Sequence, residues 1–264
     1  FKHQNYYFDK TIYANRVYNG WGDPHPETEI QFGPNIKDWP EMSALPENLL
    51  LKVVSEIHDP VTTTDELIPS GETSSYRSNP LGLAEFTLSR KDPAYVGRAK
   101  EVQKAEKARV AGEDIYEAFP EIKTPFEQIK ENFDQVDTNN TGIGSTIFAV
   151  KPGDGSAREQ AASCQKVLGG WANFAQEYAT KRYRSNLINW GMLPFLFDQE
   201  KLPFANGDYL FIPEIASAIK EKKEAIDVYV VNKGFEKFTV TLGSLTDNER
   251  EIILKGCLIN YNRK

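Results

Sequence analysis

Apolar and polar residues follow one another in patterns that predict short strands interleaved with helices. Residues 49–57 (LLLKVVSEI) and 145–150 (STIFAV) are apolar runs rich in β-branched residues, which is typical of buried strands. Residues 92–119 and 159–167 instead repeat small or apolar side chains near the helical period. Helices are also predicted at residues 122–136, 171–183, 214–221 and 245–257, and strands at residues 193–197, 208–212, 228–231 and 237–242. This alternation predicts an α/β fold centred on a sheet.

The first part of the chain has no such period. Residues 1–44 are rich in Tyr, Trp, Pro, Gly and Asn, and four prolines interrupt any helix there. We expect residues 1–48 to form an extended linker or arm from missing N-terminal domains, and residues 49–264 to form the main domain. Because the chain begins with Phe1, we expect it to be one piece of a longer protein. Residues 137–144 (DTNNTGIG) are predicted to be a polar loop before the second strand.

Composition excludes several classes of function. The chain has 264 residues, is 40% hydrophobic and 26% charged, and carries a net charge of −7. An acidic balance argues against a nucleic-acid partner, since that affinity rests on Lys and Arg neutralising phosphates. No apolar run reaches the length of a membrane span, so we expect no membrane partner. Two distant cysteines, Cys164 and Cys257, and no signal peptide favour a reducing, cytoplasmic compartment.

The most informative stretch is residues 151–162 (KPGDGSAREQAA), a glycine-rich turn between a predicted strand and a predicted helix. Gly153 and Gly155 allow a sharp turn and a close backbone approach. Ser156 occupies the expected N-cap position, and Glu159 completes a capping-box pattern. Free amides at the helix start, together with Arg158, would attract a carboxylate. Two interpretations stay open here: a capped helix with a solvated arginine, or an oxyanion site with a reactive serine.

A second stretch, residues 61–79 (VTTTDELIPSGETSSYRSN), bears on that choice. Its TTD at residues 63–65 is followed by Arg77, and residues 153–159 read GDGSARE. Together these motifs resemble the C-terminal swivelling domain of the aconitase superfamily. Further matches follow in order at residues 168–170 (LGG), 185–187 (SNL), 191–194 (GMLP) and 255–260 (KGCLIN). The resemblance covers roughly residue 49 to the C-terminus and implies a β/β/α swivelling domain, with a distorted barrel as one form.

The resemblance also implies an activity: a hydro-lyase that reversibly dehydrates a hydroxy di- or tricarboxylic acid. By carry-over Ser156 is the catalytic base, and Asp65 is a catalytic residue that supports its hydrogen-bond network. Arg77 and Arg158 would hold substrate carboxylates, and Gly155 and Ala157 would line the substrate. Three positions depart from the family pattern, because Glu66 and Gln160 replace histidines and Ala157 replaces a serine. These departures suggest a divergent hydratase with an altered substrate.

Family members work through a 4Fe–4S cluster held by three cysteines, which the two separated cysteines here cannot supply. We therefore expect the cluster to be held by missing domains of the full-length protein, and no cofactor in this chain. The expected partners are those cluster-bearing domains, joined covalently, and the hydroxy acid. A second hypothesis is a non-catalytic carboxylate-binding or interaction module. A third, an RNA-binding iron sensor, is disfavoured by the acidic charge.

Overall fold

A computed structural model describes residues 7–16, 20–199 and 201–263. It divides the chain into two compact units, Phe1–Pro34 and Asn35–Lys264. In the smaller unit the described residues form one short helix, α1 (Thr11–Ala14). There His25 lies between two carboxylates, with a ring nitrogen 3.2 Å from an oxygen of Asp23 and the other 3.2 Å from Glu27.

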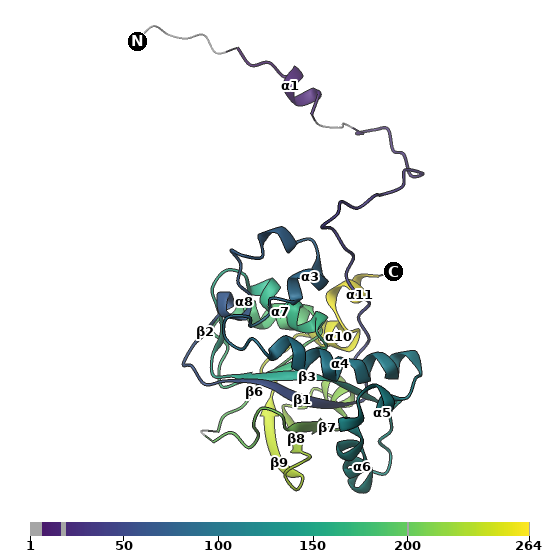
Figure 1. Cartoon of the computed structure of the whole chain (residues 1–264), viewed down its shortest axis with the longest axis vertical. Coiled ribbons are helices and arrows are strands. Elements are labelled where there is room, and N and C mark those ends of the chain that lie inside the picture. Colours follow the sequence, from purple (N-terminus) through teal and green to yellow (C-terminus); the bar gives the residue numbers. More distant parts are fainter. Residues whose placement is uncertain (1–6, 17–19, 200, 264) are drawn as a thin grey trace. The chain divides into compact units, whose positions relative to one another are not determined.

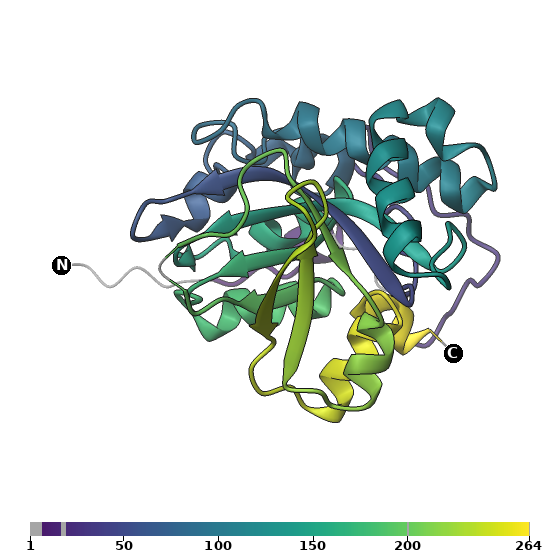
Figure 2. The ribbon, with the colours of Figure 1, turned by 90° about the horizontal axis from the view of Figure 1, so that it is seen from below.

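The larger unit is built on a barrel. Within its described residues, seven strands close in the order β1-β3-β5-β6-β9-β8-β7 (Figures 1 and 2). Their bounds are β1 (Asn48–Ile57), β3 (Thr141–Ala149), β5 (Gly170–Ala175), β6 (Leu193–Leu196), β7 (Tyr209–Ile212), β8 (Ala225–Val230) and β9 (Glu236–Thr241). β1, β3, β5 and β6 pair in parallel, and β7, β8 and β9 complete the barrel through antiparallel pairs. A separate parallel pair joins β2 (Thr62–Thr63) to β4 (Pro152–Asp154).

Helices cover the outside of the parallel strands, as Figure 1 shows for α4 and α7. Their bounds are α2 (Thr64–Leu67), α3 (Pro80–Ala84), α4 (Tyr95–Ala111), α5 (Ile115–Ala118), α6 (Lys123–Asn132), α7 (Arg158–Val167), α8 (Lys181–Asn189), α9 (Ile215–Lys220), α10 (Asp247–Leu254) and α11 (Leu258–Asn262). Two 3-10 helices are η1 (Ser74–Tyr76) and η2 (Pro120–Ile122). Gly112 ends α4 with a φ of +72°, and Thr246 caps α10 through a capping box with Glu249. Among the described helices, none has both the length and the apolar character to span a bilayer.

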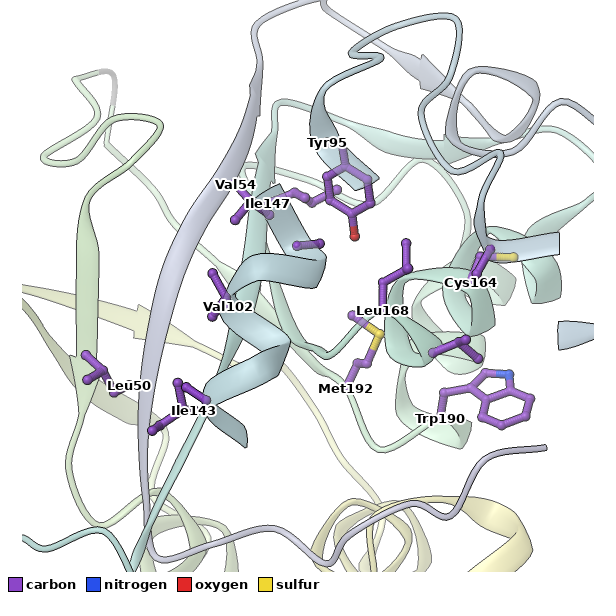
Figure 3. Close-up of a cluster of buried hydrophobic side chains, with 14 of the residues drawn as sticks. Leu50, Val54, Tyr95, Val102, Ile143, Ile147, Cys164, Leu168, Trp190 and Met192 are labelled. Carbon is purple, nitrogen blue, oxygen red and sulfur yellow. The ribbon is translucent and has the colours of Figure 1, made fainter. Parts of the chain in front are cut away.

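Strand β1 explains why the unit has two hydrophobic clusters. Successive side chains of a strand point to opposite faces. Leu50 and Val54 belong to the cluster beneath α4 and α7, which Figure 3 shows. Leu49, Leu51 and Val53 belong to a second cluster, rich in phenylalanine, that includes residues of β6, β8 and β9. Both faces of β1 are therefore buried, which accounts for its nearly continuous apolar sequence.

Most predicted elements are confirmed by the structure. The strands expected at residues 49–57 and 145–150 correspond to β1 and β3, and the helix expected at 159–167 corresponds to α7. The α/β fold class centred on a sheet is also confirmed, with the sheet closed as a barrel. Cys164 and Cys257 are both free and buried.

Two predictions are wrong. Residues 171–183 were expected to form a helix, but Gly170–Ala175 is the buried strand β5, and α8 begins only at Lys181. A strand between two others is apolar on both faces, so its sequence lacks the alternation that separates strands from helices. The loop predicted at residues 137–144 is shorter than expected, because β3 already begins at Thr141. Every residue of β3 is buried.

Candidate functional site

The two motif stretches, far apart in sequence, lie side by side in the larger unit. In the parallel β2–β4 pair, Thr62 lies beside Pro152 and Thr63 lies beside Asp154. The amide of Thr62 also donates a hydrogen bond of 3.0 Å to the carbonyl of Lys151. Helix α2 follows β2 directly and contacts both β4 and α7. The structure therefore brings the TTD stretch and the glycine-rich turn together.

The two glycines of the turn are required by its geometry. Gly155 has a φ of +130°, and a Cβ atom there would lie 2.2 Å from the Thr64 hydroxyl oxygen. Gly153 has a φ of +97°, and a Cβ atom there would lie 2.3 Å from ring atoms of Tyr183. Both positions combine a left-handed backbone with a contact too close for any side chain. The predicted sharp turn and close backbone approach are confirmed.

The predicted capping box is wrong. The N-cap of α7 is Ala157, and no side chain of the described residues caps this helix start. The carboxylate of Glu159 instead accepts a hydrogen bond of 2.9 Å from the indole of Trp190. The turn at Gly155 leaves Ser156 one residue outside the helix, so its hydroxyl does not cap the first turn. Ser156 is exposed, and its side chain makes no hydrogen bond within the described part of the chain.

The start of α7, which no side chain caps among the described residues, carries a positive electrostatic potential. The first amides of a helix have no intrahelical acceptor and carry the positive end of the helix dipole. Arg158, the first residue of α7, is half-buried beside them. Its Nε atom is buried and has no hydrogen-bond partner among the described residues. The free amides are suited to an anion such as a carboxylate, and Arg158 adds a positive charge in the same turn, where the carboxylate of Glu159 is bound by the Trp190 indole.

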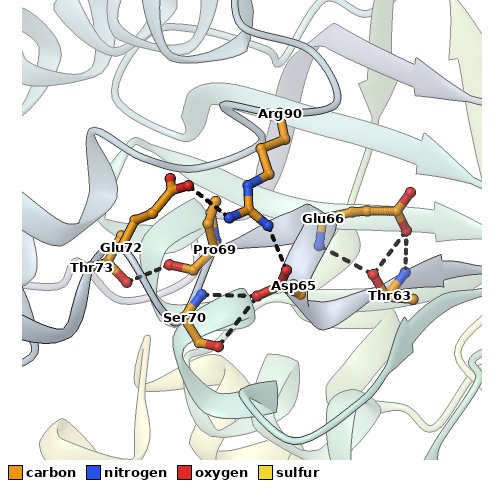
Figure 4. Close-up of polar contacts among 8 residues, drawn as sticks. All are labelled: Thr63, Asp65, Glu66, Pro69, Ser70, Glu72, Thr73 and Arg90. Carbon is orange, nitrogen blue, oxygen red and sulfur yellow. Dashed lines mark hydrogen bonds and ion pairs between the residues drawn. The ribbon is translucent and has the colours of Figure 1, made fainter.

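Asp65 is held in a small polar network, shown in Figure 4. One carboxylate oxygen accepts from the amide of Ser70 at 3.1 Å and from its hydroxyl at 3.3 Å. The other accepts from Arg90 at 2.7 Å, and Arg90 also donates to Glu72 at 2.8 Å. The Ser70 amide and the Arg90 charge lower the pKa of Asp65, so it is a carboxylate near neutral pH. The network ties the start of α2 to the loop that follows it.

Glu66, where the family pattern has a histidine, has a local structural role. Its carboxylate accepts from the Thr63 amide at 2.7 Å, and its own amide donates to the Thr63 hydroxyl at 3.2 Å. This is a complete capping box for α2. Partial burial opposes ionisation of Glu66, but the bonds from Thr63 and Lys91 outweigh it and lower the pKa. Asp65 is therefore held by Ser70 and Arg90, and Glu66 fixes the helix start beside it.

Arg77 follows η1 on the same loop and is exposed, with no hydrogen bond within the described ranges. The loop is fixed on either side: the Thr73 hydroxyl donates to the Pro69 carbonyl at 2.6 Å, and Asn79 caps α3. Helix α3 packs against α7, and both lie on the same side of the barrel in Figure 1. The segment that carries Arg77 therefore flanks the helix that begins at Arg158.

Sequence reasoning missed Arg90, which pairs with both Asp65 and Glu72. No short motif links it to Asp65, because the two residues meet only through the fold. It also missed the contact of Thr64 with Gly155. The two glycines in GDG did signal a close backbone approach, but nothing in the sequence named the approaching group.

The described residues offer no ligand set for an iron–sulfur cluster. Over the described residues, no group of three or more His, Cys, Asp or Glu side chains could hold a metal ion. Cys164 and Cys257 are each 1% exposed, and burial raises the pKa of the Cys164 thiol to about 12. A buried thiol with a raised pKa is a poor source of the thiolate that ligates iron. These residues do not fit a cluster.

The barrel, the β2–β4 pair and the glycine turn before α7 define an α/β domain with an anion-attracting helix start. The family model of the aconitase C-terminal domain matches residues 99–200. This stretch, from α4 to beyond β6, is therefore similar to an aconitase C-terminal domain. The match includes Ser156 and Arg158, whereas Asp65 and Arg77 precede it. A similar solved structure is 3-isopropylmalate dehydratase (leuD) from Methanocaldococcus jannaschii, with 22% identity over 81% of this chain and 92% of that chain and a TM-score of 0.47.

Proposed function

We propose that this chain supplies the carboxylate-binding and proton-transfer part of a hydro-lyase that reversibly dehydrates or isomerises a hydroxy di- or tricarboxylic acid. The observation that carries the proposal is the meeting of the TTD stretch and the glycine turn through β2–β4 pairing. In this arrangement the segment that carries Asp65, although distant in sequence, meets the turn that carries Ser156.

Each residue has a role that follows from its position. The free amides at the start of α7 and the guanidinium of Arg158 bind one substrate carboxylate. Ser156, exposed and ionised to its alkoxide after its proton passes to solvent, takes the proton on the carbon next to that carboxylate and becomes a neutral hydroxyl. The same amides and guanidinium stabilise the alkoxide before the transfer and the negative charge on the substrate after it. Gly155 and Ala157 present backbone without bulk, so the substrate can approach closely.

Arg77 and Asp65 act at the edge of this site. Arg77 is exposed on a loop fixed at both sides, and it is free to bind a second carboxylate bidentately. Asp65 stays ionised and anchors that loop through Ser70 and through Arg90. The substrate is thereby held at two carboxylates, which orients the carbon that loses its proton.

The family chemistry also requires a 4Fe–4S cluster, which we assign to a partner part of the protein, on the same chain or on a separate one. When bound, such a cluster supplies a Lewis acid for the substrate hydroxyl. The chain presented here would be inactive without that part. Its two free, buried cysteines favour a reducing compartment, and we propose the cytoplasm.

The test is Ser156→Ala in the complete enzyme with its cluster-bearing part. We expect turnover of the hydroxy acid to fall about 10²- to 10⁴-fold, the usual range for a lost general base. The matched control is Ser244→Ala, because Ser244 is also exposed and its side chain makes no hydrogen bond within the described residues. If Ser156→Ala turns over at the rate of that control, the base assignment is wrong.

One observation favours a second function, carboxylate binding without catalysis. No described side chain hydrogen-bonds the Ser156 hydroxyl, so nothing within this part of the chain orients it. Calorimetry on the chain alone separates the two functions. Tight binding of a polycarboxylate without iron supports a binding module, and weak or absent binding supports a site completed by the cluster-bearing part.

A further inference from the structure

A pocket lies at the end of α7 opposite to the candidate site. It has a volume of about 300 Å³ and is bounded by α4, the end of α7, the start of β5 and the segment 40–43. Its apolar walls include Met42, Val110, Val167 and Trp171. Pockets that bind small ligands are typically at least this large and mostly apolar, with a few placed polar groups.

The polar group of interest in this pocket is Lys166. This residue is 7% exposed, and its Nζ atom is buried with no hydrogen-bond partner among the described residues. The ammonium lies over the ring of Trp171, 3.7 Å from the ring centroid. That cation–π contact compensates only part of the lost hydration. Burial lowers the pKa of Lys166 from its ordinary value of 10.5 to about 8, while Cys257 and Glu106 act in the opposite direction.

The neighbouring acid cannot neutralise this lysine, because it already has partners. Glu106 accepts two hydrogen bonds from the Arg109 guanidinium, at 2.8 and 2.7 Å. It also accepts from the amide of Ile143 at 2.8 Å. Lys166 is therefore a buried cation left with an aromatic face and no anion. Such an arrangement is costly unless a ligand completes it.

We propose that this pocket binds a small monocarboxylic acid with an apolar body, whose carboxylate pairs with Lys166. The long lysine side chain has several rotatable bonds, so its ammonium can turn from the indole toward a ligand. A single negative charge matches Lys166, the buried cation among the described residues of this pocket, whereas Lys107 is exposed to solvent. A dianion such as phosphate would carry excess charge beside Glu41 and Glu106, which line the same pocket. The apolar walls fit an aliphatic or aromatic body.

The probes are hexanoate, hexanol and hexylamine, which share one apolar body and differ in charge. Binding to the 264-residue chain is followed in ¹H–¹⁵N spectra through the Trp171 indole and the amides of Gly169 and Gly170. We expect hexanoate to shift these signals and to bind roughly 10- to 100-fold more tightly than hexanol, the range for a hydrogen bond to a charged group. Hexylamine should bind most weakly.

Three variants make the result decisive. Lys166→Met should remove the preference for hexanoate over hexanol, whereas Lys107→Met should keep it, because Lys107 is an exposed lysine of the same pocket. Val110→Trp, at a 61% exposed position of the pocket wall, should lower the affinity for all three ligands because the indole fills the pocket. Equal binding of hexanoate and hexanol, or a preference that survives Lys166→Met, would overturn the proposal.

The same spectra separate this pocket from the candidate catalytic site. If hexanoate shifts only the amides of Ser156 and Arg158, the acid binds at the start of α7 and the pocket proposal is wrong. That outcome leaves the proposed function standing. Conversely, if turnover measurements show that Ser156 is not the base, the pocket proposal still stands. It rests on Lys166, Trp171 and Glu106, which take no part in the proposed reaction.

Discussion

Helix α7 places one cation at each end, and the two ends differ in what surrounds them. At its start, Arg158 is half-buried next to exposed Ser156, and no side chain of the described residues caps the helix. At its end, Lys166 is enclosed by α4 and β5, with Trp171 against its ammonium. In both places a side-chain nitrogen is buried without a hydrogen-bond partner among the described residues.

The helix dipole favours an anion at the start of α7 and a cation at its end. At the start it adds to the arginine charge, so an anion is attracted by both and water can reach the site. At the end it stabilises a cation, which helps to keep Lys166 protonated despite burial. The start is thus suited to ligand exchange at the surface, whereas the end is suited to a ligand that fills a pocket.

The largest expected effect concerns the backbone that forms the start. Gly155→Ala should destabilise the chain by about 2–5 kcal/mol, since it adds a left-handed non-glycine residue and a clash with Thr64. The measurement is the free energy of unfolding in urea. Affinity for a carboxylate at the start of α7 should fall as well, because the turn must move away from α2.

The control is Gly71→Ala, in the loop that follows α2. A Cβ atom at Gly71 meets nothing within 4 Å, so the change should stay within about 0.5 kcal/mol. If both variants unfold at the same urea concentration, the close contact of the two motif stretches does not limit stability, and the geometry of the start is looser than described.

The next effect has the opposite sign and concerns the end of the helix. A lysine pKa near 8 in place of 10.5 corresponds to about 3 kcal/mol of lost stability at neutral pH. Lys166→Met should therefore raise the free energy of unfolding by about 1–3 kcal/mol at pH 7, the lower values reflecting the lost contact with Trp171. This gain distinguishes a buried cation from the ordinary solvated lysine.

The effect of Lys166 on the free energy of unfolding should depend on pH. Between pH 8 and 10.5 the unfolded lysine binds a proton that the folded one has lost, so wild-type stability rises with pH in this window. The advantage of Lys166→Met should shrink across the same window. Glu106 on α4 and Cys257 before α11 are the ionisable neighbours that could distort the curve. Lys107→Met should show neither the gain nor the pH dependence, and a gain equal to that of Lys166→Met would refute the explanation.

The sequence predicted the start of α7 better than its end. The resemblance placed Asp65 and Gly155 in one site, and the pairing of β2 with β4 brings the segments that carry them together. The helix start itself was placed one residue too early, because Ser156 and Glu159 match a capping pattern that the φ of Gly155 prevents. A local pattern cannot report the backbone angle of the residue before it.

The end of the helix could not be predicted, for a different reason. A lysine in the last turn of an amphipathic helix is ordinarily solvated, and its spacing carries no other signal. Lys166 is buried because α4 and the segment 40–43 cover it, and both are distant in sequence. Strand β5 was mistaken for a helix for a related reason, since burial on both faces removes the alternation.

The smallest effect tests whether the loop beside the start is held by charge. Arg90→Gln removes one partner each from Asp65 and Glu72, both exposed, so the melting temperature should fall by roughly 2 °C or less. The pKa of Asp65, followed by ¹³C titration, should rise toward its ordinary value but not reach it, because the Ser70 amide still donates. Stability that depends on ionised Asp65 is lost as pH falls through the folded pKa, so this loss should begin at a higher pH in the variant.

Lys100→Gln, which removes an equally exposed ion pair with Glu85, should leave the Asp65 titration unchanged. An Asp65 curve that is identical in Arg90→Gln and wild type would mean that the Ser70 amide alone holds this carboxylate, and that the loop carrying Arg77 is positioned without Arg90.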